Sequence, residues 1–239
     1  MINKRKYIGV ESRVHFKVLE DAIADYFQTG SFDRDKCLLH IKQYTEGENR
    51  AGKILKHVTV LIQRNNYLLA QLKKVVKDFD YYRFSLDERK AIILCLFCNS
   101  YPITFDILTS LSQGFKVQEN INKQVIVQKI GAIYGSNRAM HIAITEILPF
   151  LIECGTIQRI KMGLYSLNSR LVVKNRFVVE LIVYTDISLS GSKSILIDDL
   201  NFKPWYLYFD TSDWKDDQFN FLISKKDSAV GKGYLTING

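Results

Sequence analysis

The chain has 239 residues, of which 47% are hydrophobic and 24% charged, and its formal net charge at pH 7 is +8. This composition is ordinary for a globular protein and excludes collagen-like, low-complexity and disulfide-dense chains. The charge is uneven, with +6 over residues 48–77, +6 over residues 123–176 and −3 over residues 177–239. Clustered cations favour a polyanionic partner such as nucleic acid.

Hydropathy along the chain argues against a membrane partner. No stretch of the sequence approaches the roughly 18 uncharged apolar residues of a membrane-spanning helix, and its start lacks the apolar segment of a signal peptide. Four cysteines are compatible with a reducing compartment. We therefore expect a cytoplasmic protein.

Residues 1–115 predict a bundle of amphipathic helices joined by short connections. Asp33 is placed to cap one helix, and Ser85 with Glu88 forms a capping-box pattern before another. Apolar spacing predicts the helices over residues 14–27, 49–63, 67–76, 89–98 and 102–111. The outward residues of two of them are basic and form a candidate second surface for DNA: Arg50, Lys53, Lys56 and Lys74. A solvated lysine-rich helix face is an equally good interpretation of residues 48–77.

Residues 120–155 predict two helices separated by a tight turn. The first has its apolar residues mostly three or four positions apart: Ile121, Val125, Ile126, Ile130 and Ile133. Gly135 is suited to a left-handed helix C-cap, and Ser136 to the N-cap of the next helix. Pro149 would remove the hydrogen bond to the Thr145 carbonyl and kink the second helix, unless that helix begins later or tolerates the bend.

The second helix divides into an apolar and a polar face. The predicted buried stripe is Ala139, Ile142, Ala143, Ile147, Leu148 and Leu151. This stripe leaves another face with four hydrogen-bonding residues: Asn137, Arg138, His141 and Thr145. Arginine and asparagine at the start of such a helix are typical of base-edge or phosphate contacts.

Residues 156–167 predict a two-stranded hairpin with a turn at Met162–Gly163. Arg159 and Lys161 alternate with apolar residues along it and could follow a phosphate backbone. Further on, residues 171–189 are compatible with either a helix or a strand. Short strands are predicted over residues 205–209, 219–223 and 234–237, and no internal repeat is apparent.

The sequence offers little for catalysis. Cys95 and Cys98 form a CxxC pair, but no second pair of ligands stands at zinc-site spacing, so both thiols are expected inside a helix as small hydrophobes. The four histidines are isolated, and no nucleotide loop or nucleophile motif is present. We expect no enzymatic activity, no metal, no cofactor and no small-molecule substrate. A metal-dependent enzyme using Asp198 or Asp216 is the weakest alternative.

Residues 116–168, with GSNRAMH as turn and helix start and GTIQRIKMGLYSL as wing, resemble winged helix-turn-helix DNA-binding domains. The wider layout is similar to the small helical A component of BREX phage-resistance systems. Its points of similarity are the ESR segment, the RAGKILKHVTVLIQRN helix, the dipeptide at residues 101–102 and the final winged unit. The resemblance implies double-stranded DNA binding in host defence, with other subunits of a defence complex as further partners.

The predicted fold class is therefore mainly α with a small β wing. The predicted domains are a helical bundle over residues 1–115, a winged helix-turn-helix over residues 116–170 and a mixed α/β C-terminal module over residues 171–239. The leading functional hypothesis is a non-enzymatic DNA-binding protein contacting DNA through Ser136 and the polar face of the second helix. The alternative is a protein-interaction adaptor whose wing residues Leu164 and Tyr165 meet a partner subunit.

Overall fold

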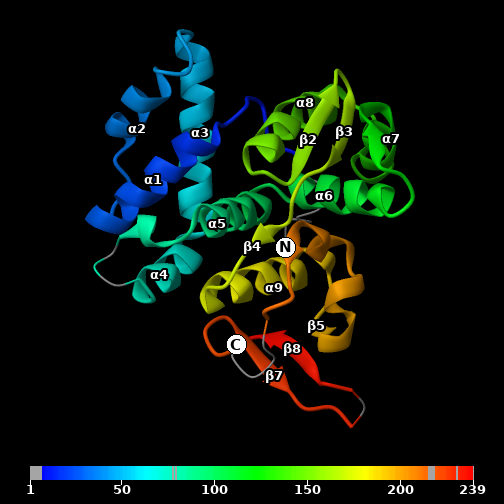
Figure 1. The fold of residues 1–239 in the computed structure, drawn as a ribbon. Helices are drawn as coiled ribbons and strands as arrows, with labels where there is room; N and C mark the ends of the chain where they lie inside the picture. The colour runs from blue at the N-terminus through cyan, green and yellow to red at the C-terminus, as the bar shows by residue number, and fades with distance from the viewer. Residues whose placement is uncertain (1–6, 77, 79, 215–218, 230, 239) are drawn as a thin grey trace.

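The computed structural model describes residues 7–76, 78, 80–214, 219–229 and 231–238, and it is mainly helical with three small sheets. Asp216, one of the carboxylates considered for a metal, and Lys77 lie outside these residues. Within these residues, the N-terminal part contains five α-helices and the short 3-10 helix η3 (Figure 1). They are α1 (Phe16–Thr29), α2 (Arg34–Ile41), α3 (Glu48–Arg64), α4 (Asn66–Lys74), η3 (Tyr81–Arg83) and α5 (Leu86–Ser100).

Local hydrogen bonds confirm the two predicted helix caps. The Asp33 carboxylate accepts from the backbone N–H groups of Asp35 and Lys36 at the start of α2. Ser85 and Glu88 form the reciprocal capping box at the start of α5. In both cases the side chain satisfies donors that have no partner within the helix.

Two helices far apart in the sequence, α5 and α9 (Arg176–Ser190), pack against each other in the middle of the molecule (Figure 1). Residues 91–98 of α5 and 177–183 of α9 are buried on every side, because both segments are apolar around the whole helix except at Glu180. Residues 171–189, for which the sequence left two possibilities, thus form the short strand β4 (Leu171–Val172) and α9. The core runs without interruption through all three predicted segments.

Residues 102–167, here called the first unit, fold as a helix, a strand, two helices and a hairpin. These elements are α6 (Pro102–Phe115), β1 (Asn120–Asn122), α7 (Lys123–Tyr134), α8 (Arg138–Glu153), β2 (Ile157–Lys161) and β3 (Leu164–Leu167). The three strands form one antiparallel sheet in the order β1-β3-β2. The predicted hairpin and its Met162–Gly163 turn are confirmed, and Gly163 has a φ of 73°.

Two details of the turn in the first unit differ from the prediction. Gly135 is the C-cap of α7 and has a positive φ of 79°, as predicted, but its ψ of 145° lies outside the left-handed helical region. The N-cap of α8 is Asn137, whose side chain accepts from the Met140 N–H, and Ser136 is not the cap. Asn137 takes this place because its carbonyl oxygen reaches the third backbone N–H of the helix.

The helix faces also shift from those predicted. Ile121 is buried on β1 instead of belonging to the helix, and Ile133 is exposed. In α8, Ala139 is exposed, while Met140 and Ile144 join the buried stripe. The helix continues through Pro149 to Glu153, so the proline does not terminate it.

Residues 176–237, here called the C-terminal unit, begin with α9 and end in a second three-stranded sheet. Its further elements are β5 (Ser194–Leu196), η4 (Ile197–Phe202), η5 (Pro204–Tyr208), β6 (Phe209–Asp210), β7 (Ile223–Lys226) and β8 (Tyr234–Ile237). The sheet is antiparallel with the order β5-β8-β7, and β6 instead pairs in parallel with β4. The strand predicted over residues 234–237 is confirmed, whereas residues 219–223 contribute only Ile223 to a strand.

The strand predicted over residues 205–209 is wrong except at Phe209, which begins β6, because Pro204 starts a 3-10 helix that continues to Tyr208. Its alternating aromatic residues do not face opposite sides of a sheet. Trp205 donates from its ring nitrogen to the Ile182 carbonyl of α9, and Tyr208 donates from its hydroxyl to the Leu108 carbonyl of α6. These two hydrogen bonds fix η5 between α6 and α9.

A buried carboxylate attaches the C-terminal sheet to α9. Glu180 is fully buried and accepts hydrogen bonds from the backbone N–H groups of Asn220, Phe221, Leu222 and Ile223 at 2.6–3.0 Å. Four donors compensate the charge that the interior would otherwise leave unsolvated.

Over the described part of the chain, no single helix is long and apolar enough to cross a membrane.

Candidate nucleic-acid interface

The start of α8 presents a short row of exposed polar side chains. Ser136, Asn137 and Arg138 are exposed at the turn, and His141 and Thr145 follow on the same helix face at intervals of three and four residues. The exposed face predicted from the sequence is therefore confirmed as exposed. The helix has no acidic residue in its first turn, so the positive end of its dipole adds to the charge of Arg138.

Not all of these side chains are equally available to a ligand. Asn137 uses its carbonyl oxygen to cap α8, which leaves its amide group to donate at 3.4 Å to the Tyr134 carbonyl. Thr145 donates from its hydroxyl to the His141 carbonyl. Ser136, Arg138 and His141 are thus the side chains of this row for which the structure gives no internal hydrogen bond to a described residue.

Lys123 belongs to the same surface, although the sequence did not point to it. It is the first residue of α7, and its ammonium group donates to the Thr145 hydroxyl at 2.9 Å. Its backbone N–H donates to the carbonyl of Gly163 in the hairpin turn at 2.7 Å. Lys123 therefore ties the hairpin turn to the exposed face of α8, a relationship that only the tertiary structure brings about.

The β2–β3 hairpin carries cations next to this face. Arg159 and Lys161 are both exposed, and they pair across the strands with Tyr165 and Leu164. A β-bulge between Arg159 and Lys161 shifts the register by one residue. Neither cation forms an ion pair with a residue that the structure describes.

The hairpin corrects one part of the adaptor hypothesis. Tyr165 is buried, so it supports the sheet from inside and is not a surface that a partner could meet. The apolar residues that the hairpin does expose are Ile160, at 53%, and Met162, at 86%. Leu164 is half-buried.

The second group of predicted contact residues lies on the N-terminal helices, across the molecule from the first unit (Figure 1). Arg50 and Lys56 are exposed on α3, Lys53 is half-buried there, and Lys74 is exposed on α4. Lys56 lies 3.6 Å from the Glu11 carboxylate, and Lys74 donates to Gln71 at 3.4 Å. Lys56 and Lys74 are therefore less available for phosphates than the cations of the hairpin, whereas Arg50 and Lys53 form no ion pair with a described residue.

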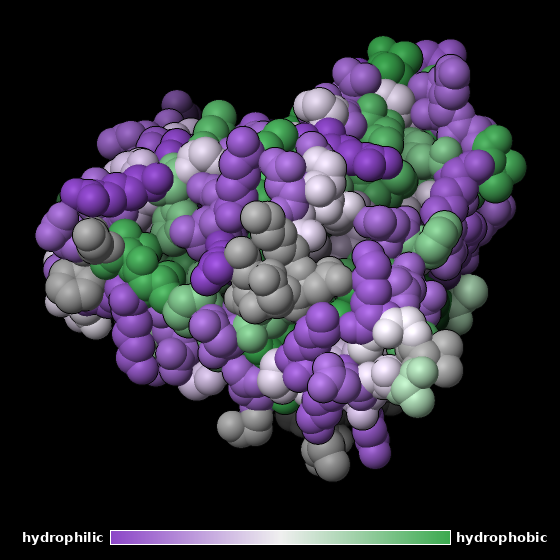
Figure 2. All heavy atoms as spheres, turned by 60° about the horizontal axis from the view of Figure 1, so that its bottom comes forward, coloured by the Kyte–Doolittle hydropathy of each residue, from purple (hydrophilic) through white to green (hydrophobic). Residues whose placement is uncertain are grey.

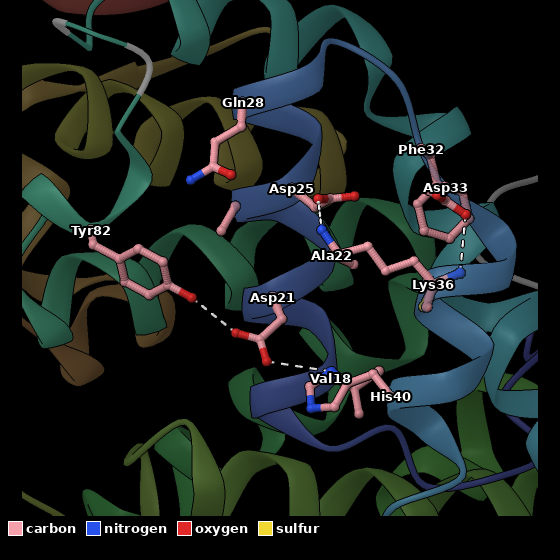
Figure 3. A pocket seen from close by; sticks show the side chains of 12 residues that line it. Val18, Asp21, Ala22, Asp25, Gln28, Phe32, Asp33, Lys36, His40 and Tyr82 are labelled. Atoms are coloured by element: carbon pink, nitrogen blue, oxygen red, sulfur yellow. Dashed lines mark hydrogen bonds and ion pairs between the residues drawn. The ribbon is translucent and has the colours of Figure 1, made fainter.

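A pocket of about 310 Å³ between α1, α2 and Tyr82 holds most of its charged groups in internal pairs (Figure 3). Asp21 accepts from the Tyr82 hydroxyl at 2.9 Å and lies 3.3 Å from the His40 ring nitrogen. Lys36 forms an ion pair with Asp25. The charges of this pocket therefore serve the contact between α1 and α2.

The cysteines are buried, as predicted for Cys95 and Cys98. Burial raises the pKa of the Cys95 thiol to about 12, and it also raises that of Cys98. Thiols of this kind are poor nucleophiles at neutral pH. Within the residues that the structure describes, no three His, Cys, Asp or Glu side chains come together in a metal-binding group.

Comparisons were made with protein-family models, curated proteins and solved structures. None of them matches the chain.

Proposed function

We propose that the first unit is a winged helix-turn-helix and that the protein binds double-stranded DNA through it, without catalysis. The observation that carries this proposal is the combination of its element order, its β1-β3-β2 sheet and the exposed polar start of α8. In such units the second helix of the turn enters the major groove with its first residues. Here those residues include Arg138, with His141 one turn later.

Each part of the surface has a distinct role in this proposal. Arg138 and His141 face the groove, where an arginine can contact guanine or phosphate. Arg159 and Lys161 of the wing and Lys123 at the start of α7 lie against the phosphate backbone. Because most of these contacts go to phosphates, binding tolerates changes of DNA sequence.

Fluorescence anisotropy with a labelled duplex of arbitrary sequence tests this assignment. At low salt, Arg138→Glu and the double variant Arg159→Glu/Lys161→Glu are expected to weaken binding at least about tenfold, since each places a negative charge against phosphate. Lys36→Glu, an equal charge reversal on α2, serves as the control and retains most of the affinity. Equal affinities for all four proteins would refute the assignment.

The resemblance to the BREX A component suggests a biological role for DNA binding by this chain. We propose that DNA binding by this chain serves a bacterial phage-resistance system, in which it acts as an accessory subunit. In cells carrying such a system, Arg138→Glu is expected to restore phage plating while the protein level stays unchanged. Full resistance with this variant would separate the DNA-binding surface from defence.

The exposed apolar wing supports a second candidate, an adaptor that meets a partner subunit through Ile160 and Met162. Under this alternative, Ile160→Asp/Met162→Asp dissociates the complex isolated with the wild-type chain, and Arg138→Glu leaves that complex intact. If Ile160→Asp/Met162→Asp leaves the complex intact, and Arg138→Glu alone causes a loss of function, DNA binding without an adaptor role is favoured.

A further inference from the structure

The C-terminal unit repeats the chain path of the first unit. The first unit has α6 and β1, then α7 and α8, then β2 and β3. The C-terminal unit has α9 and β5, then η4 and η5, then β7 and β8, with β6 inserted before the hairpin. In both sheets the last strand is central, with the orders β1-β3-β2 and β5-β8-β7.

The two sheets also agree in the register of their strands, apart from the β-bulge between Arg159 and Lys161, which has no counterpart in β7. Ile121 pairs with Tyr165 at the middle of β1, and Ile195 pairs with Leu235 at the middle of β5. These four paired residues, on β1, β3, β5 and β8, are buried, whereas their neighbours along each strand are not. The hairpin strands β2 and β7 both begin with a fully buried isoleucine. This shared register indicates two versions of one structural unit.

The correspondence assigns counterparts to the wing cations. Arg159 pairs with the second residue of β3, and Lys225 pairs with the second residue of β8. Lys161 pairs with the first residue of β3, and Lys226 pairs with the first residue of β8. Lys225 and Lys226 are exposed, and neither forms an ion pair with a residue within the described part of the chain.

The counterpart of α8 differs from α8. It is η5, whose Trp205, Tyr206 and Tyr208 are buried between α6 and α9. In the described part of the C-terminal unit, the counterpart of α8 therefore presents no exposed face to read base edges, and the hairpin cations are the contact that has a counterpart in the first unit. Cations on a hairpin without a reading helix suit a phosphate backbone of any sequence.

The two hairpins lie at opposite ends of the molecule. Figure 1 shows β2 and β3 at the top and β7 and β8 at the bottom. Figure 2, with the lower side brought forward, shows a face covered mostly by hydrophilic side chains. One short, straight duplex bound to the first hairpin therefore leaves the second hairpin free.

We propose that the β7–β8 hairpin is a second, sequence-independent DNA contact, through Lys225 and Lys226, and that it takes a separate duplex segment. This inference rests on the proposed function of the first unit for its chemistry. A structural explanation of the two lysines exists as well, because β7 is an edge strand and lysines on edge strands prevent pairing with other chains.

Sedimentation with a fluorescent duplex of about 12 base pairs at low salt tests the proposal, since a duplex of this size covers about one contact. The wild-type chain is expected to bind two duplexes. Lys225→Glu/Lys226→Glu and Arg159→Glu/Lys161→Glu are each expected to bind one, and Lys17→Ala/Lys36→Ala, which removes two paired lysines from α1 and α2, is expected to bind two.

The outcomes separate the two sites. If the wild-type chain binds one duplex and the Lys225→Glu/Lys226→Glu variant also binds one, the second contact is refuted and the function proposed for the first unit is unaffected. One duplex that is lost only in the Lys225/Lys226 variant overturns the function proposed for the first unit. If the Lys225/Lys226 variant keeps two duplexes but self-associates in gel filtration, the lysines protect the sheet edge and the inference is wrong.

Discussion

The carboxylate of Glu153, at the end of α8, accepts a hydrogen bond from the backbone N–H of Phe16, the first residue of α1, at 2.6 Å. His15, the N-cap of α1, has no capping hydrogen bond from its own side chain, and its ring nitrogen lies 3.0 Å from the same carboxylate. Arg13 also forms an ion pair with Glu153. The last residue of α8 thus supplies the cap that α1 lacks.

Glu153→Ala is expected to lower the free energy of unfolding by about 1–3 kcal/mol, because the change removes a charge-assisted cap and an ion-pair partner. Urea unfolding measures the effect. Glu146→Ala, a partly exposed glutamate on the same helix, is the control and should change stability by less than about 0.5 kcal/mol. Equal effects of the two substitutions would mean that the cap contributes nothing.

Local sequence patterns predicted the elements whose stabilising contacts are local. Asp33 and the Ser85–Glu88 pair cap helices within three residues, so their roles can be read directly from the sequence. The same holds for the Met162–Gly163 turn. Lys123 could not be assigned to the candidate surface, because its contacts with Thr145 and Gly163 depend on the packing of three elements.

The repeated chain path could not be predicted from the sequence for a related reason. The helices α7 and α8 have 3-10 counterparts, η4 and η5, with no shared apolar period. The wrong strand prediction over residues 205–209 hid the correspondence further. The alternating aromatic residues of this segment contact α6 and α9, and they do not lie on the two sides of a sheet.

The start of α8 offers a matched pair of substitutions. Asn137→Ala is expected to lower the free energy of unfolding by about 1 kcal/mol, because the Met140 N–H loses its acceptor. Ser136→Ala at the neighbouring position should leave stability nearly unchanged, since Asn137 and not Ser136 is the cap. Thermal unfolding of both variants checks this. A larger loss for Ser136→Ala would restore serine as the capping residue.

Acid is expected to destabilise the fold through His57. Its ring is buried, with Nε2 accepting from the Glu11 N–H at 3.2 Å and Nδ1 lying 2.8 Å from the Tyr101 hydroxyl. Burial lowers the pKa of His57 to about 4. Since the unfolded chain keeps a value near 6.5, its proton uptake begins first as the pH falls. Stability is then lost between about pH 6.5 and 4, by about 3 kcal/mol in total.

Urea unfolding of the wild type, His57→Gln and His141→Gln across this pH range isolates the contribution. The His57 variant should lose less stability on acidification than the wild type, whereas the variant of the exposed His141 should follow the wild type. Parallel profiles for all three proteins would rule out His57 as a source of acid sensitivity.

Binding of duplex DNA by the first unit mainly through phosphates makes the association constant strongly dependent on salt. With two unrelated duplexes, the logarithm of the association constant is expected to fall linearly with the logarithm of salt concentration. The slope should be about −3 or steeper for both, as expected when at least three or four cations displace counterions. A flat salt response, or no binding even at low salt, would contradict phosphate binding by the first unit.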